Sequence, residues 1–416
     1  MKRYWLILIL TIILIVYLAA GAFSECWLGI VTHHKIGEDF LIYYQAYTKA
    51  RSGDNPYLPY HIGRSYVYHP FGLTFVSLFS WHSNISLAIL SWALISVGAW
   101  LLSIFVVLRV AKKHFAPITV FHNEGFTTRF IVLMFLGFAP FWETIHIGQI
   151  NTFVALFIYL ALYFYQGERP LLSGVFLALA ISLKTSPVVL VLCFLVQFRF
   201  RVVLSTLISL TALSIIPAIQ FSPQILGNFL AILPKLGAEI HPTMYNQSIL
   251  SACFRVFAHL GKGEIGNVLT IRHKIAFLVV LFGILLKGAF MPKHSTLTNT
   301  WLFTTILVIT VFFSPLVWYH HSVLLLLPLT LLLLRQSKIS FAVGMGLISL
   351  IQIDRSFEYI TKNAAMPVLL AHSILLGIVI AIFLQSRWNV ITNKTKQARS
   401  LAWLLHSPDS RRKTVE

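Results

Sequence analysis

The sequence of 416 residues is 57% apolar and only 11% charged, and its mean hydropathy is +0.80. Soluble globular domains carry about a quarter charged residues, so this composition excludes that class. The apolar residues form long runs separated by short polar loops, and they lack the period-2 alternation of membrane barrel strands. Because a spanning segment has to satisfy its backbone hydrogen bonds without water, the sequence predicts an all-α polytopic membrane protein.

The apolar runs predict about twelve transmembrane helices, several of them shorter than the roughly 20 residues that a perpendicular helix needs. The first run, 5–23, directly follows Lys2 and Arg3 and lacks a convincing small-residue cleavage site. This favours an uncleaved anchor over a secretory signal. The remaining candidates are 86–108, 130–141, 152–165, 171–183, 188–198, 202–219, 275–290, 302–313, 322–334, 339–353 and 368–384.

Charge sets the expected orientation. Most of the 32 basic residues fall in alternate loops and in the C-terminal tail, and the positive-inside rule places both of these in the cytoplasm. We therefore expect a transmembrane domain at 1–386, with amphipathic helices in a long first extracytoplasmic loop at 24–85, and a basic cytoplasmic tail at 387–416. The net charge of +19 is explained by this topology and by contact with anionic lipid headgroups, so no nucleic-acid partner is expected.

Polar groups gather in four loops on the predicted outer face, where ionisable residues are functional candidates by default. Taken singly, each loop also has a structural explanation, because tyrosines and tryptophans form aromatic belts and a lysine can extend toward headgroups. Their occurrence on one face favours a shared site. The loops are 37–72 with Glu38 and Asp39, 140–151 with Gln149 and Asn151, 182–187 with Lys184, and 312–322 with His320 and His321.

The chemistry of these side chains leaves two classes of function open. A carboxylate at the outer surface suits removal of a proton from a sugar hydroxyl, and a lysine with neutral donors suits a lipid-phosphate leaving group. A transporter of lipid-linked sugars would also need charges within the membrane, but it predicts them deep in several spans rather than at the outer ends. The predicted outer loops hold no Asp-x-Asp pair, and no metal or other cofactor is expected.

Six short motifs in register resemble glycosyltransferase family 87. These are GT-C enzymes that use polyprenyl-phosphate sugars, typically polyprenyl-phosphate mannose, to glycosylate acceptors on the outer side of the membrane. The chain departs from the expected Tyr-Pro-Pro at Tyr68-His69-Pro70, and its tail after about residue 385 has no counterpart. The motifs are DFxxYYxA at 39–46, GxNPY at 53–57, YxYxP at 66–70, GQIN at 148–151, SGx5Ax3Kx2P at 173–187 and SPx2WxHH at 314–321.

The resemblance implies a GT-C-type fold and an inverting enzyme in the inner membrane of a bacterium. Its donor would be a polyprenyl-phosphate hexose, expected to be mannose, and its acceptor a glycolipid or a cell-envelope glycan. Transfer of arabinofuranose or another pentose shares every one of these features. Asp39 resembles the family's aspartate and would be the general base, with Glu38 as a less favoured alternative and His321 as a further catalytic candidate.

The remaining site candidates divide by expected substrate. Tyrosines with helical spacing after Asp39 predict a helix lying on the membrane, with Asn55 and Pro56 breaking it before the chain returns. Such tyrosines serve interfacial packing more often than sugar binding. We expect Lys184, His320, Gln149, Asn151 and Tyr68 near the donor phosphate, and Tyr43, Tyr44 and Asn55 in the acceptor loop.

Overall fold

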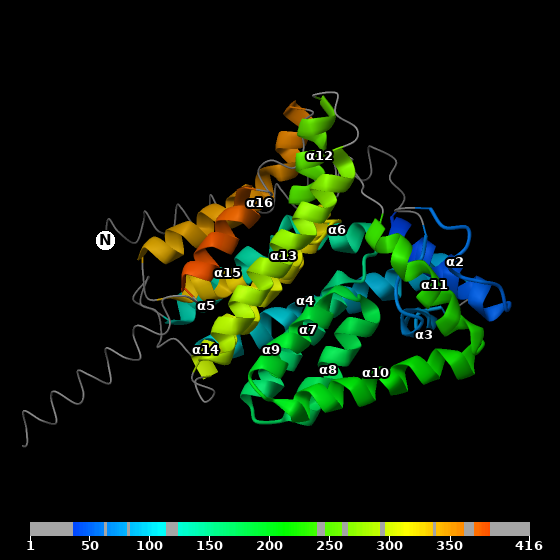
Figure 1. Cartoon of the computed structure of the whole chain (residues 1–416). Helices are drawn as coiled ribbons and strands as arrows, with labels where there is room; N and C mark the ends of the chain where they lie inside the picture. Colours follow the sequence, from blue (N-terminus) through cyan, green and yellow to red (C-terminus); the bar gives the residue numbers. More distant parts are fainter. Residues whose placement is uncertain are drawn as a thin grey trace, which may run out of the picture.

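The computed structural model describes residues 36–61, 65–80, 84–113, 124–238, 246–259, 265–291, 296–335, 338–361 and 370–382. Every regular element among these residues is a helix and none is a strand, which confirms the all-α class for this part of the chain (Figure 1). The predicted first span at 5–23 and the predicted tail at 387–416 lie outside the described residues.

The helices follow one another with short connections. Two of them, α2 and α3, occupy the loop that the sequence places outside the membrane. The elements are α2 (Glu38–Arg51), α3 (Phe71–Ser77), α4 (Ile85–Lys112), α5 (Glu124–Leu136), α6 (Ala139–Ile147), α7 (Asn151–Gln166), α8 (Pro170–Leu183), η2 (Ser186–Leu190), α9 (Val191–Val196), α10 (Phe200–Gln220), α11 (Gln224–Ala238), α12 (Ile249–His259), α13 (Ile265–Ala289), α14 (Thr296–Phe312), η3 (Tyr319–Leu325), α15 (Leu326–Leu334) and α16 (Lys338–Thr361), followed by a helix at Leu370–Ile382.

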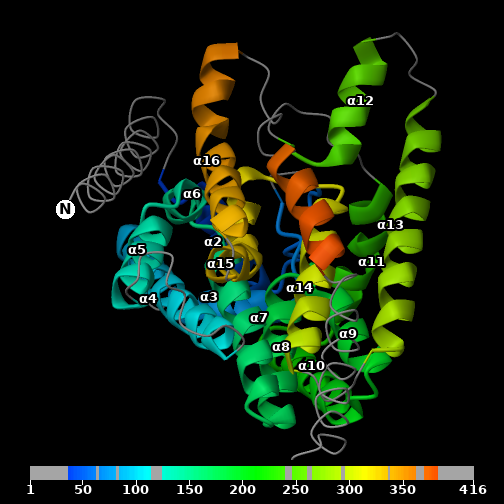
Figure 2. The same cartoon turned by 90° about the vertical axis from the view of Figure 1, so that its left-hand side faces the viewer.

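Four stretches within the described residues are long and apolar enough to cross a membrane: Ile85–Lys112, Thr127–Ile147, Phe200–Gln220 and Val268–Ala289. Eight shorter apolar helices accompany them. The last of the four stretches, in α13, runs along the edge of the molecule, and its large apolar side chains are mostly exposed (Figure 2). Such a surface is suited to lipid, so the chain is a membrane protein, and the number of about twelve spans stays a prediction.

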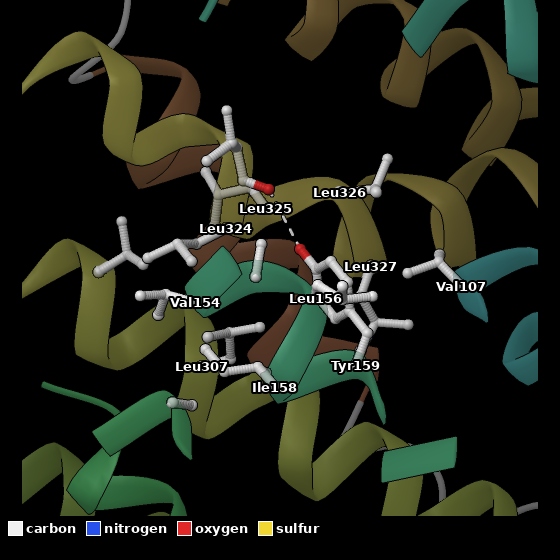
Figure 3. Packing of buried hydrophobic residues seen from close by; sticks show 14 of the residues in the cluster. Val107, Val154, Leu156, Ile158, Tyr159, Leu307, Leu324, Leu325, Leu326 and Leu327 are labelled. Carbon is white, nitrogen blue, oxygen red and sulfur yellow. Dashed lines mark hydrogen bonds between the residues drawn. The ribbon is translucent and has the colours of Figure 1, made fainter. Parts of the chain in front are cut away.

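The core lies around α7, which packs against α4, α8 and η3. Figure 3 shows Val154 and Ile158 of α7 among buried leucines of α14, η3 and α15. The hydroxyl of Tyr159 donates a 3.1 Å hydrogen bond to the carbonyl of Val323 in η3. Buried backbone carbonyls need a partner, so this bond satisfies a polar group of the 3-10 turn inside an apolar core.

Three predicted spans are less regular than expected. The run at 130–141 is interrupted at Gly137 and Phe138, where the side chain of Gln352 from α16 accepts from Ala139 N at 2.7 Å and donates to Gly137 O at 2.9 Å. The runs at 188–198 and 322–334 both begin as 3-10 helices. Two helices, α11 and α12, form between residues 220 and 274, where no span was predicted.

Candidate active site

The start of α2 packs tightly on the turn between α6 and α7. Gly37 donates from its backbone N–H to the carbonyl of His146 at 2.7 Å. Gly148 ends α6 in the left-handed conformation, with φ of 73°, and a Cβ added there would lie 2.7 Å from Cβ of Phe40. Only glycine fits this close approach, which brings the next residue, Gln149, beside the first turn of α2.

Gln149 joins α2 to this turn through its amide. Its Nε2 donates to Oδ2 of Asp39 at 2.6 Å, while its Oε1 accepts from the hydroxyl of Tyr43 at 2.9 Å and from the backbone N–H of Ile150 at 3.0 Å. The two donors on Oε1 fix the amide so that its NH₂ group points at the carboxylate. Oδ2 of Asp39 is thereby engaged, and Oδ1 is the oxygen that we assign to proton transfer.

The environment of Asp39 strengthens it as a base. The side chain is half-buried, and loss of water raises its pKa to about 6. The hydrogen bond from Gln149 opposes this rise, the negative charges of Glu143 and Glu38 add to it, and Lys184 lowers the pKa slightly. A carboxylate with this pKa is ionised at neutral pH and still has appreciable proton affinity.

Lys184 lies directly after α8, where the backbone becomes extended before Pro187 starts the next turn. Its Nζ donates to Oδ1 of Asn151 at 2.9 Å and lies 2.7 Å from Nε2 of His321. Nδ1 of His321 accepts from the backbone N–H of Trp318 at 3.2 Å. Burial lowers the pKa of Lys184 to about 7, although the charge of Asp39 opposes this change.

Asn151 connects this cluster to the first one. It is the first residue of α7, only two positions after Gln149, and its Nδ2 donates to the carbonyl of His320 at 3.4 Å. One turn of chain therefore supports the carboxylate of Asp39 on one side and the amine of Lys184 on the other. The cluster draws on α2, α7, η3 and the residue after α8, which the sequence had placed on one face.

Tyrosines line the other side of Gln149. Tyr43 is buried, and its hydroxyl lies 3.4 Å from that of Tyr68. Tyr57 and Tyr66, which the sequence reading did not select, are also buried, and Tyr57 donates to the carbonyl of Tyr68 at 3.0 Å. Tyr44 is half-buried and contacts the ring of Phe40. Because Tyr43 faces the interior, the membrane-facing helix predicted here presents only part of its tyrosine pattern outward.

Two predicted residues lie away from these contacts. Glu38 is exposed, and its charge acts on Asp39 through space. Asn55 is half-buried, and its Oδ1 accepts from the backbone N–H of Tyr57 at 3.0 Å, which forms a local turn. This bond explains the asparagine by the conformation of the loop.

His69, the departure from the expected motif, ties the first loop to distant helices. Its Nδ1 accepts from the N–H of Phe71 at 3.2 Å, and its Nε2 lies 3.0 Å from the hydroxyl of Ser214 in α10. The ring also contacts Phe229 of α11. Burial lowers the pKa of His69 to about 4, so the ring is neutral at physiological pH and donates from Nε2. The ends of α10 and α11 accordingly lie beside α2 and α3 in Figure 1.

A buried segment that the sequence reading missed holds the histidine loop. Asn246 donates from Nδ2 to the carbonyl of Pro315 at 3.0 Å and accepts at Oδ1 from Val317 N at 3.0 Å. Gln247 N donates to the carbonyl of Val317 at 2.7 Å, and Ser248 Oγ donates to that of Pro315 at 3.0 Å. No local pattern announces these pairs, because the partners are about seventy residues apart in sequence.

The comparison with known families decides the class of protein. The model of glycosyltransferase family 87 matches residues 66–317, which is more than half of the 416 residues. The chain belongs to glycosyltransferase family 87. It is thus a membrane glycosyltransferase that acts on a sugar donor and an acceptor. The match includes Gln149, Asn151 and Lys184, begins after Asp39 and ends before His320.

No curated protein matches this chain. Among the residues that the structure describes, no group of three or more histidines, cysteines or carboxylates is placed to hold a metal ion. The expectation of a reaction without a metal therefore stays a prediction.

Proposed function

We propose that this family 87 enzyme transfers a hexose, expected to be mannose, from a polyprenyl-phosphate sugar to an acceptor hydroxyl outside a bacterial inner membrane. The acceptor would be a glycolipid or a cell-envelope glycan, and the anomeric carbon would be inverted. The observation that carries the proposal is the turn at 149–151, which holds the carboxylate of Asp39 through Gln149 and the amine of Lys184 through Asn151. A base and a phosphate-binding group are what this transfer needs.

In the proposed reaction, the acceptor O–H gives its proton to Oδ1 of Asp39 while the oxygen forms a bond with the anomeric carbon. The bond from that carbon to the phosphate oxygen breaks, and its electron pair leaves with the phosphate. The donor is a phosphodiester with one negative charge, and the departing polyprenyl phosphate carries a second. Lys184 and His321 are placed together to offset this charge, and such donors are each worth about 10² to 10³ in rate.

Two alternatives from the sequence have different standing. Transfer of arabinofuranose or another pentose uses the same base and the same leaving group, so it differs only in the donor sugar. A transporter of lipid-linked sugars is disfavoured by membership of a glycosyltransferase family.

Product formation in detergent tests the proposal, because detergent leaves no compartments for transport. Purified protein is given a panel of polyprenyl-phosphate sugars and a membrane-lipid extract, and a new glycosylated species is sought. Asp39→Asn keeps the size of the side chain but removes its basicity, so the rate is expected to fall by roughly 10² or more. Asp54→Asn, at an exposed loop position, serves as the matched control and keeps normal activity.

Two results would contradict this proposal. One is a wild-type protein that complements its own deletion in cells but makes no product with any donor. The other is an Asp39→Asn protein that retains near-normal transfer, which would exclude Asp39 as the base.

A further inference from the structure

We propose, resting on the function above, that Lys184 and His321 bind the phosphate of the donor by taking up one proton, so that anion binding at this site is coupled to protonation. The pair would be uncharged before the donor arrives and singly positive once the phosphate is bound. The donor's phosphate would then supply the negative charge that the protein's interior lacks at this point.

The first support is the short distance within the pair. Nζ of Lys184 and Nε2 of His321 lie 2.7 Å apart, which leaves room for one hydrogen between them. If both groups were protonated, two N–H bonds would point at each other and two positive charges would meet at hydrogen-bond distance. The pair therefore holds at most one proton beyond its neutral state.

The second support is the other nitrogen of the imidazole. Nδ1 of His321 accepts from the backbone N–H of Trp318 at 3.2 Å, so its lone pair points at that N–H. In a neutral ring the proton then lies on Nε2, where it faces Lys184. Lys184 has to accept this proton with its own lone pair, while one of its N–H groups donates to Asn151 at 2.9 Å. The tautomer is inferred from the hydrogen bonds, and it requires an uncharged amine.

The surroundings agree with an uncharged amine. Burial lowers the pKa of Lys184 to about 7, and the charge of Asp39 on α2 is the one opposing influence. Glu143 on α6 and Glu38 on α2 act on Asp39 rather than directly on the pair. On the histidine side, His320 of η3 and His372 of the helix Leu370–Ile382 are the other titratable groups within electrostatic reach.

The direction of the pH dependence follows from this linkage. A bound anion favours the charged amine and so raises its pKa above the value of about 7 in the free protein. Below that pH the pair is already protonated and affinity is constant. Above it, each bound anion has to bring in a proton, so affinity falls by about tenfold per pH unit until the pKa of the bound state is reached.

Titration calorimetry on the full-length protein tests the coupling. The probe is a short-chain isoprenyl methyl phosphodiester, which resembles the donor's phosphate and stays a monoanion at every pH used. Titrations in two buffers of different ionisation enthalpy give the number of protons taken up. We expect uptake to approach one proton per bound anion at about pH 8 and to be near zero at about pH 6.

Two variants sharpen the test. Lys184→Arg replaces the amine by a group that is always charged, so binding should lose its pH dependence and its proton uptake. Lys49→Arg changes an exposed lysine that donates to the carbonyl of Leu58, and it should behave like the wild type. If Lys184→Arg does not fold, the proton count of the wild type still decides.

The coupling is wrong if the wild type binds the probe equally well at pH 6 and pH 8 with no proton uptake. It is also wrong if the enzyme makes a glycosylated product but does not bind the probe at either pH. In both cases the transferase proposal survives, because that proposal depends on product formation alone.

Discussion

At Asp39, a single amide sets the strength of the proposed base. Loss of water raises the pKa of this carboxyl to about 6, and the hydrogen bond from Gln149 limits that rise. A bond to the charged form of an acid stabilises that form and lowers its pKa. Gln149, which the sequence reading assigned to the donor phosphate, thus contacts the carboxylate and helps to decide the pH at which it ionises.

The pH profile of Gln149→Met follows from this contact. Transfer requires the carboxylate form of Asp39, so the wild-type rate should fall as the pH drops through about 6. Loss of the amide removes a stabiliser of the charged form, which raises the pKa and moves this acid limb to a higher pH. Rates of transfer measured between about pH 5 and pH 8 check the shift.

Gln45→Met, at an exposed position of the same helix, is the control and should keep the wild-type limb. A variant that is merely misfolded would lose rate at every pH without moving the limb. An unmoved limb in Gln149→Met would show that this amide does not control Asp39.

At the level of elements, the position of α2 depends on one glycine. Gly148→Ala would place a Cβ 2.7 Å from that of Phe40 and a side chain at a left-handed φ of 73°. The conformation alone costs about 1 to 2 kcal/mol, and the clash pushes α2 and Asp39 away from Gln149. We expect a lower melting temperature and a larger relative loss of transfer activity.

Gly98→Ala is the matched control, because Gly98 lies inside α4 with no atom within 4 Å of the added Cβ. Alanine favours a helix interior over glycine by about 1 kcal/mol, so this variant should be as stable as the wild type or more so. Equal melting temperatures for the two variants would contradict the close approach.

The segment at 246–248 gives a second prediction for an element. Asn246→Asp keeps the oxygen that accepts from Val317 N but replaces the donor to Pro315 by an oxygen that repels the carbonyl. A buried polar group left in this way costs about 1 to 3 kcal/mol, so the loop before His321 should shift and both stability and transfer should fall. Thermal unfolding and transfer rates measure the effect.

The control for this variant is Asn84→Asp at the start of α4. Oδ1 of Asn84 only accepts, from Ser86 N and Leu87 N, and aspartate caps a helix equally well. Asn84→Asp should therefore match the wild type. A stable, fully active Asn246→Asp protein would show that the loop does not need the donated bond.

Across the whole molecule, the proposed chemistry requires α2 to be outside the cell membrane. In a background without cysteine, Ser52→Cys directly after α2 should react with an impermeant thiol reagent on intact cells, whereas Ser407→Cys in the predicted tail should not. The expectation rests on the distribution of basic residues. The reverse labelling pattern would place Asp39 in the cytoplasm and contradict the proposed acceptor side.

The extent of what sequence could predict follows from range. Local signals are enough for α2, for the turn at 148–151 and for the apolar runs, because turn residues and periodicity act over a few positions. The bond from Gln149 to Asp39 joins residues 110 apart, and the segment at 246–248 meets its partners about seventy residues later. Such pairs are fixed by tertiary packing, which leaves no mark in local spacing. The motifs nevertheless placed Lys184, Asn151 and His321 in one site, and the structure joins them.

The interruption between α5 and α6 has a consequence for how the protein is made. Its free backbone groups at Gly137 and Ala139 are satisfied by Gln352, and the ribosome adds this residue more than two hundred positions later. Unpaired backbone groups in lipid cost several kcal/mol each, so the early hairpin stays incomplete in the membrane until α16 inserts. A chain that stops after α15 should accordingly be degraded rapidly in a pulse-chase experiment, and a half-life equal to that of the full chain would contradict this order of assembly.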